Sequence, residues 1–154
     1  MATKTRRKET LPSGGSRVEV VHLGTEVTAV VSDAIRVLRN EHKHASIVGM
    51  GTSMEPYIED GTRMVFEPYD GMAGEIVVGG TYMTVVKYIS GLGLDMHLVK
   101  EVDDSDDTFR VGSPEGWDVG WCYRHNVIGR YLGDWNVLRR RGIRVAKHNT
   151  GTST

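Results

Sequence analysis

The segment GTSMEPYIEDG at residues 51–61, followed by the apolar run MVF at residues 64–66, decides how the chain is interpreted. Gly51 permits a tight bend ahead of Ser53, and Pro56 restricts the backbone as the chain continues. The Glu-Asp-Gly turn at the end of the segment leads into a strand of apolar residues. The segment therefore predicts a serine hydroxyl that is held on a constrained loop between two strands.

Short strands are expected on both sides of this segment. Runs of β-branched and aromatic residues alternate with glycine- and aspartate-rich turns about every 8–12 residues, which is typical of an all-β sandwich or barrel. The expected fold class is mainly β, a coiled body of short strands with one N-terminal amphipathic helix. The expected strands are residues 17–23, 45–48, 63–67, 75–78, 81–89, 95–102, 108–111, 126–132 and 135–138.

The chain is expected to divide into three parts. Residues 1–16 are polar and end in a stretch rich in Ser and Gly, which predicts a flexible arm. Residues 17–138 are expected to form the β domain, with a helix at about residues 26–40 because apolar residues recur there at steps of three and four. Residues 139–154 are expected to be a basic and polar tail, since they begin with three arginines.

The composition favours a soluble protein of the cytoplasm or of a phage particle. The formal net charge of −1 gives no overall field that would attract nucleic acid, which is therefore not an expected partner. No apolar run approaches the roughly 18–20 residues that cross a bilayer, so no membrane contact is expected. Cys122 is the single cysteine, which excludes an internal disulfide.

No cofactor or metal site is expected. His42 and His44 are two histidines alone, and a zinc site needs further Cys, His or carboxylate ligands. The acidic run at residues 103–107 lacks the glycine and the final glutamate of a calcium-binding loop. Both features are therefore interpreted as surface residues.

The segment around Ser53 resembles the nucleophile segment of the LexA-like and signal-peptidase-like serine peptidases, the S24 and S26 families. In those proteins a Ser-Met-Pro segment precedes a Gly-Asp turn, a Gly-Asp-Ile/Val-Val segment and a strand of the type Val-Lys-Arg-Val. The resemblance covers about residues 45–135 and implies a stand-alone domain without a helix-turn-helix or a membrane anchor. The later parts of the pattern resemble GEIVV at residues 74–78, LVKEV at 98–102, GSPE at 112–115 and VIGR at 127–130.

The resemblance implies a catalytic pair, with Ser53 as the nucleophile and a lysine as the base. A serine hydroxyl reacts when a base takes its proton, and burial lowers the pKa of a lysine so that its neutral amine can act. Lys100 is favoured because strand alternation places it between two apolar side chains. Lys87 and His97 remain alternatives, since Lys87 has apolar neighbours and some signal-peptidase relatives use a histidine at this position. His97 and Lys100 would face opposite sides of a regular strand, so at most one of the two can act as the base for Ser53.

Acyl transfer also produces an oxyanion, which backbone N–H groups placed in advance can stabilise. The N–H of Ser53 is the expected donor. Gly51 would allow the backbone of a substrate to approach closely, and Met54 is expected to pack beneath the site.

The expected function is that of a serine endopeptidase that cleaves a protein substrate or its own N-terminal arm. The arm offers a small-residue bond in the sequence Ser13-Gly14-Gly15. The expected partners are protein or peptide substrates, and other copies of the chain that assemble through the terminal arms. The alternative is a non-catalytic structural or assembly protein, for example of a phage particle, because function depends on the site and not on the fold.

Overall fold

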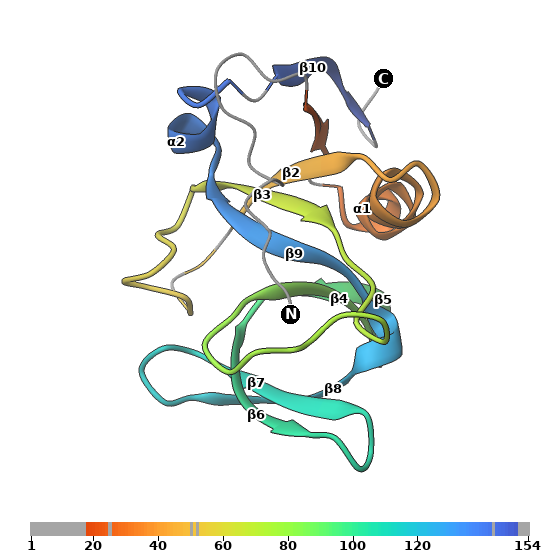
Figure 1. The fold of residues 1–154 in the computed structure, drawn as a ribbon, viewed down its shortest axis with the longest axis vertical. Helices are drawn as coiled ribbons and strands as arrows, with labels where there is room; N and C mark the ends of the chain where they lie inside the picture. The colour runs from red at the N-terminus through yellow and green to blue at the C-terminus, as the bar shows by residue number, and fades with distance from the viewer. Residues whose placement is uncertain (1–17, 25, 50, 52, 143, 151–154) are drawn as a thin grey trace.

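The molecule is built mainly from β-strands (Figure 1). The computed structural model describes residues 18–24, 26–49, 51, 53–142 and 144–150. About 45% of the chain is in strands and 17% in helices, which confirms the mainly β fold class expected from the sequence. The arm predicted at residues 1–16 and the end of the predicted tail lie outside the described residues.

The helices and strands follow one another along the chain in a simple order. They are β1 (Glu19–Leu23), α1 (Val27–Ala34), η2 (Ile35–Asn40), β2 (His44–Val48), β3 (Arg63–Pro68), β4 (Tyr82–Tyr88), β5 (Gly91–Asp95), β6 (Leu98–Asp103), β7 (Thr108–Gly112), β8 (Asp118–Tyr123), η3 (Arg124–Asn126), β9 (Val127–Asp134), α2 (Trp135–Arg139) and β10 (Arg144–Thr150). The π-helical η2 continues α1, so together they form the helix expected at about residues 26–40.

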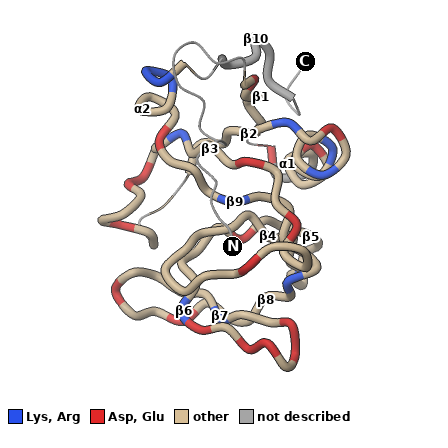
Figure 2. The backbone as a smooth tube through the Cα atoms, in the orientation of Figure 1, with Lys and Arg blue, Asp and Glu red and all other residues tan. Residues whose placement is uncertain are grey.

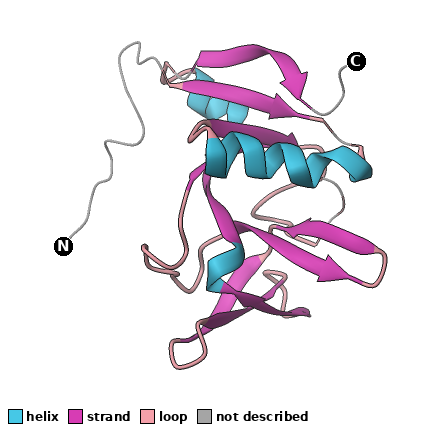
Figure 3. Ribbon diagram, turned by 90° about the vertical axis from the view of Figure 1, so that its right-hand side faces the viewer, coloured by secondary structure: helices cyan, strands magenta, loops and turns pink. Residues whose placement is uncertain are grey.

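The strands form two sheets, and the chain passes between the sheets twice. The large sheet has the order β10-β1-β2-β3-β9-β4-β5, and the small sheet has the order β6-β7-β8. β1 is parallel to β10 and to β2, whereas the other neighbouring strands are antiparallel. Figure 3 shows the helix formed by α1 and η2 lying against the large sheet. The chain leaves the large sheet after β5 and returns to it at β9, and the first of these crossings contributes His97 to the site described below.

The helix and the large sheet enclose the main apolar core. Val37 and Leu38 of η2 are fully buried together with Phe66 of β3 and Ile128 of β9. Burial of a side chain of this size typically stabilises a protein by about 1.5–3 kcal/mol. A second core packs against the small sheet and contains Ile76, Tyr82, Val99, Phe109, Val111, Cys122 and Val127.

The strand predicted at residues 135–138 is wrong, because these residues lie in α2. Asp134 determines the change of structure, since its side chain accepts a hydrogen bond from Asn136 N at 2.7 Å. An aspartate at this position satisfies an N–H group that has no partner inside the helix. The apolar residues of the segment then follow helical rather than strand periodicity, with Leu138 buried.

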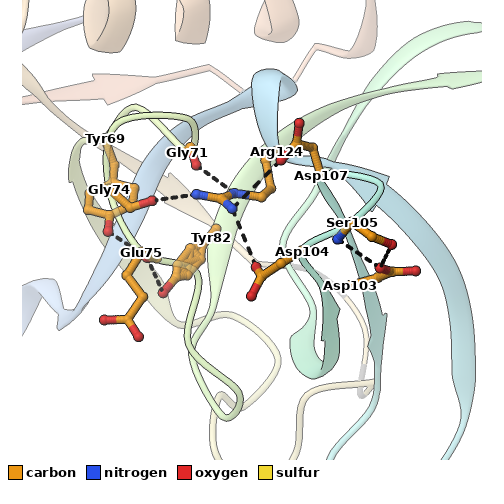
Figure 4. Close-up of polar contacts among 10 residues, drawn as sticks. All are labelled: Tyr69, Gly71, Gly74, Glu75, Tyr82, Asp103, Asp104, Ser105, Asp107 and Arg124. Atoms are coloured by element: carbon orange, nitrogen blue, oxygen red, sulfur yellow. Dashed lines mark hydrogen bonds and ion pairs between the residues drawn. The ribbon is translucent and has the colours of Figure 1, made fainter.

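The strand predicted at residues 75–78 is also wrong, because this segment belongs to the irregular connection between β3 and β4. The side chain of Arg124 binds the connection by donating from Nε to Gly71 O at 2.9 Å and from Nη2 to Gly74 O at 3.0 Å (Figure 4). The hydroxyl of Tyr69 donates to the carbonyl of Glu75 at 2.6 Å. Side chains thus bind backbone groups that would otherwise pair with a neighbouring strand.

Candidate active site

Ser53 lies on a loop that leaves the large sheet between β2 and β3. Gly61 N donates a hydrogen bond to Gly49 O at 2.9 Å and closes the base of the loop. Gly51 N donates to Asp60 Oδ1 at 2.8 Å and joins its two sides. Gly51 and Gly61 have φ angles of +94° and +86°, which glycine adopts without a steric penalty. These contacts constrain the backbone on both sides of the serine.

His97 lies beside Ser53, at the break between β5 and β6. Its Nε2 is 3.1 Å from Ser53 Oγ, and its Nδ1 is 2.6 Å from Asp95 Oδ1. The side chain of Asp95, the last residue of β5, is 3% exposed, whereas that of His97 is 24% exposed. A hydroxyl, an imidazole and a carboxylate therefore form one continuous chain of hydrogen bonds that leads from the surface to a buried charge.

The carboxylate of Asp95 determines which nitrogen of His97 carries the hydrogen. An ionised carboxylate only accepts hydrogen bonds, so the Nδ1–H group of His97 donates to Asp95. Nε2 then has a free lone pair, and it accepts the hydrogen bond from Ser53 Oγ. With a neutral His97 and an ionised Asp95, the three groups have the hydrogen-bond order of a Ser-His-Asp triad.

Two further groups hold the buried carboxylate of Asp95. His97 N donates to Asp95 Oδ2 at 3.2 Å, and Cys122 Sγ lies 4.0 Å from the same oxygen. Burial, assisted by the negative charge of Asp95, raises the pKa of Cys122 to about 12, so the thiol keeps its hydrogen. These donors compensate for the removal of a carboxylate from water.

The structure brings Ser53 together with His97 rather than with either lysine. Lys100 lies on β6 at the point where the pairing of β6 with β7 shifts its register. Lys87 is exposed on β4, close to the turn that connects β4 to β5. Among the described residues, no hydrogen bond joins Ser53 to Lys87 or to Lys100. The geometry favours His97 as the base, because the chain crosses between sheets at this point and does not form the continuous strand assumed for residues 95–102.

The remaining predicted residues lie around the same serine. Met54 is buried in the main core, and Gly51 is exposed on the loop. Within the described part of the chain, no acceptor is bonded to the N–H of Ser53. The role of this N–H group as an oxyanion donor stays a prediction.

Ser53 lines two pockets. The larger has a volume of about 180 Å³ and a largely apolar wall that includes Met54, Ile58, Met64, Leu94 and Met96. Gly49 also lines this pocket. A Cβ at this position would lie 2.9 Å from Met64 Cε, so a glycine leaves room for the methionine side chain. The smaller pocket has a volume of about 80 Å³ and is lined by Ser53, Glu55, Ser113, Glu115 and Trp117.

Asp95 is the residue of the candidate site that the sequence analysis missed. A signal for it was present, because Asp95 and His97 are two residues apart and such residues face the same side of an extended chain. A carboxylate and an imidazole at this spacing, in a segment predicted to be a strand, would have suggested an oriented histidine.

The chain was compared with protein-family models, curated proteins and solved structures. No family model, curated protein or solved structure gave a significant match. None of the helices in the described residues is long and apolar enough to span a membrane. The described residues also contain no group of three or more His, Cys, Asp or Glu side chains arranged to hold a metal ion.

Proposed function

We propose that the chain is a serine peptidase of the LexA-like or signal-peptidase-like type, in which His97 acts as the base in place of a lysine. The observation that carries the proposal is the chain of hydrogen bonds from Ser53 to His97 and Asp95, at 3.1 and 2.6 Å. The family assignment is supported by the order of the sequence motifs. It is also supported by the position of Ser53 on a loop of a mainly β body.

The geometry supports acyl transfer in two stages. His97 Nε2 takes the proton of Ser53 Oγ while Oγ attacks the carbonyl carbon of a peptide bond, and the N–H of Ser53 donates to the resulting oxyanion. Asp95 remains a carboxylate and stabilises the positive imidazolium. His97 then gives its proton to the leaving amine, and the C–N bond breaks to leave an ester on Ser53.

Hydrolysis of the ester completes the reaction. His97, now neutral, takes a proton from a water molecule that attacks the ester carbonyl. The second tetrahedral intermediate collapses as His97 returns this proton to Ser53 Oγ. The products are a new carboxyl terminus, a new amino terminus and the original enzyme.

The apolar pocket beside Ser53 supports a peptide as the substrate. Its volume of about 180 Å³ and its position next to the hydroxyl suit an aliphatic side chain adjacent to the bond that is cleaved. Methionine side chains are flexible, so a wall that contains three of them can adapt to several aliphatic shapes.

A fluorophosphonate probe tests the proposal, because it bonds covalently to an activated serine. We expect the wild-type protein to be labelled at Ser53, as located by mass spectrometry, and Ser53→Ala to remain unlabelled. His97→Ala should lower the labelling rate on the order of 10⁶-fold, since the serine and the histidine of a triad act as a unit. Lys100→Ala and Lys87→Ala are the matched controls and should be labelled at the wild-type rate.

The other outcomes identify which part of the proposal is wrong. Labelling that is lost in Lys100→Ala but retained in His97→Ala would make the lysine the base. A folded wild-type protein that is neither labelled nor able to cleave any member of a peptide library would refute the peptidase proposal. That result would favour the non-catalytic assembly protein built on the same fold.

A further inference from the structure

We propose that the smaller pocket beside Ser53 binds a lysine or arginine side chain of the peptide that is cleaved. The inference rests on the proposed function and specifies its substrate class, namely peptides with a basic residue close to the scissile bond. The pocket is lined by Ser53, Glu55, Ser113, Glu115 and Trp117.

Two loops from different sheets form this pocket. Glu55 lies two residues after Ser53 on the loop between β2 and β3, whereas Ser113, Glu115 and Trp117 belong to the loop between β7 and β8. Figure 2 shows acidic residues of both loops on the same side of the molecule. Because Ser53 lines this pocket as well as the apolar one, a peptide bond presented to its hydroxyl has side-chain positions within reach of both pockets.

The charges of the pocket favour a cation. In the part of the chain that the structure describes, no ion pair involves Glu55 or Glu115. By contrast, acidic side chains on the outer face of the small sheet are paired, since Arg110 binds both Glu101 and Asp118. Two carboxylates at the edge of a small pocket, without a paired cation among the described residues, attract a positive group of the substrate.

Trp117 adds an aromatic wall to the same pocket. Its side chain is 70% exposed, although tryptophan is highly buried in most proteins. An ammonium or guanidinium group over an indole ring is attracted to the face of the ring, and arginine also stacks on it. The pocket therefore distinguishes a basic side chain from a neutral one of similar length.

The loop that carries Glu115 and Trp117 is held in place before a peptide binds. Ser113 N donates to Trp117 O at 2.9 Å, and Trp117 N donates to Ser113 Oγ at 3.0 Å. A Cβ at Gly112 would lie 2.0 Å from Trp117 O, so the two ends of the loop approach too closely for a side chain. A preorganised wall of this kind lowers the entropy cost of binding.

The size of the pocket is consistent with a basic head group. Its volume of about 80 Å³ is less than half of the roughly 180 Å³ of the apolar pocket. A small pocket with carboxylates suits a compact ammonium or guanidinium group. The aliphatic stem of lysine or arginine would lie against Trp117.

Binding of peptides to the Ser53→Ala variant tests the proposal without turnover. The probes are fluorescein-labelled nonapeptides with methionine fixed at the centre and one flanking position at a time occupied by Arg, norleucine or Glu. At one flanking position, we expect fluorescence anisotropy to show that Arg binds at least about 10-fold more tightly than norleucine, with Glu the weakest. The preference should decrease as salt is added, because the charges are near the surface.

Charge reversal at Glu115 supplies the decisive variant. In the Ser53→Ala background, Glu115→Lys should reverse the order, so that the Glu peptide binds more tightly than the Arg peptide. Asp106→Lys makes the same change of charge on the exposed loop between β6 and β7 and should keep the original order. The proposal is overturned if Glu115→Lys leaves the order unchanged, or if Arg and norleucine bind equally at every position.

Failure of this inference can be distinguished from failure of the peptidase proposal. Fluorophosphonate labelling of the wild-type protein requires no basic residue in a substrate, so it reports on Ser53 independently of the smaller pocket. A labelled Ser53 without a preference for basic peptides refutes the role of the pocket alone. A preference for basic peptides without labelling refutes the peptidase proposal and leaves a peptide-binding site.

Discussion

Replacement of Asp95 by asparagine tests the proposed triad at its least exposed member. The carboxylate lies 2.6 Å from His97 Nδ1 and 3.2 Å from His97 N. Asparagine keeps one oxygen that can accept the backbone hydrogen bond, and it presents its NH₂ group to Nδ1. Because an NH₂ group donates, it favours the imidazole tautomer with hydrogen on Nε2. That hydrogen points at Ser53 Oγ, so His97 can no longer take the proton of the hydroxyl.

The expected loss is on the order of 10⁴-fold in kcat, which is typical of a triad whose carboxylate becomes an amide. At about 1.36 kcal/mol for each factor of ten, this loss raises the activation free energy by about 5.4 kcal/mol. The assays are the rate of fluorophosphonate labelling and the hydrolysis of a peptide selected from the library. Asp103→Asn is the matched control, because its carboxylate accepts hydrogen bonds from Ser105 on an exposed loop.

A folded Asp95→Asn variant with more than a tenth of the wild-type rate would refute the proposed role of the carboxylate. Thermal unfolding separates this result from loss of the fold, since Asp95 is buried and lies close to Cys122. Retention of the melting temperature together with a large loss of rate is the expected combination. If Lys100→Ala lost a comparable factor in rate while Asp95→Asn stayed active, the lysine and not His97 would be the base.

Two further predictions concern buried titratable groups. Burial lowers the pKa of His44 to about 4, whereas the unfolded chain binds this proton near pH 6.5, so only the unfolded state is protonated between these values. The free energy of unfolding in urea should therefore fall by about 3 kcal/mol from pH 7 to pH 4, and an equally large fall in His44→Phe would contradict this assignment. Since the pKa of Cys122 is raised to about 12, iodoacetamide at pH 8 should modify the thiol in urea but not in the native protein. Rapid alkylation of the native protein, measured by mass spectrometry, would show that the thiol is not buried as described.

The strands on either side of Ser53 were predictable from local sequence. Residues 45–48 and 63–67 were expected, and the structure has β2 at His44–Val48 and β3 at Arg63–Pro68. Both segments contain consecutive buried residues, residues 45–47 in β2 and 64–67 in β3, most of them apolar, and the two strands pair antiparallel. Local pattern and tertiary environment agree here, which explains why the loop that carries Ser53 could be placed.

The two incorrect strands fail because side chains outside the apolar run determine the backbone. Asp134 caps α2 and converts the following residues to a helix. Arg124, some 50 residues further along the chain, binds the segment that contains Gly71 and Gly74. A cap can be recognised in a sequence, but a contact over that separation cannot be inferred from the local composition of the segment.

The preference for Lys100 depended on the assumption that residues 95–102 form one regular strand. Asp95 pairs with Thr84 in the large sheet, whereas Leu98 pairs with Gly112 in the small sheet. The chain therefore changes sheets across Met96 and His97, and alternation of faces does not continue through this point. The periodicity of apolar residues does not reveal such a crossing, because the segments before and after it both have the composition of a strand.

The environment of Asp95 favours the catalytic interpretation over the scaffold interpretation. A buried carboxylate is costly to remove from water, and an apolar pair of similar size is often at least as stabilising as a buried ionic pair. Yet Asp95 is 3% exposed, and the imidazole that it binds reaches a partly exposed serine. A protein that used this fold only as a scaffold would gain little from a charged group directed at a hydroxyl. Orientation of a base toward a nucleophile accounts for the burial, the order of the hydrogen bonds and the position of the two pockets at once.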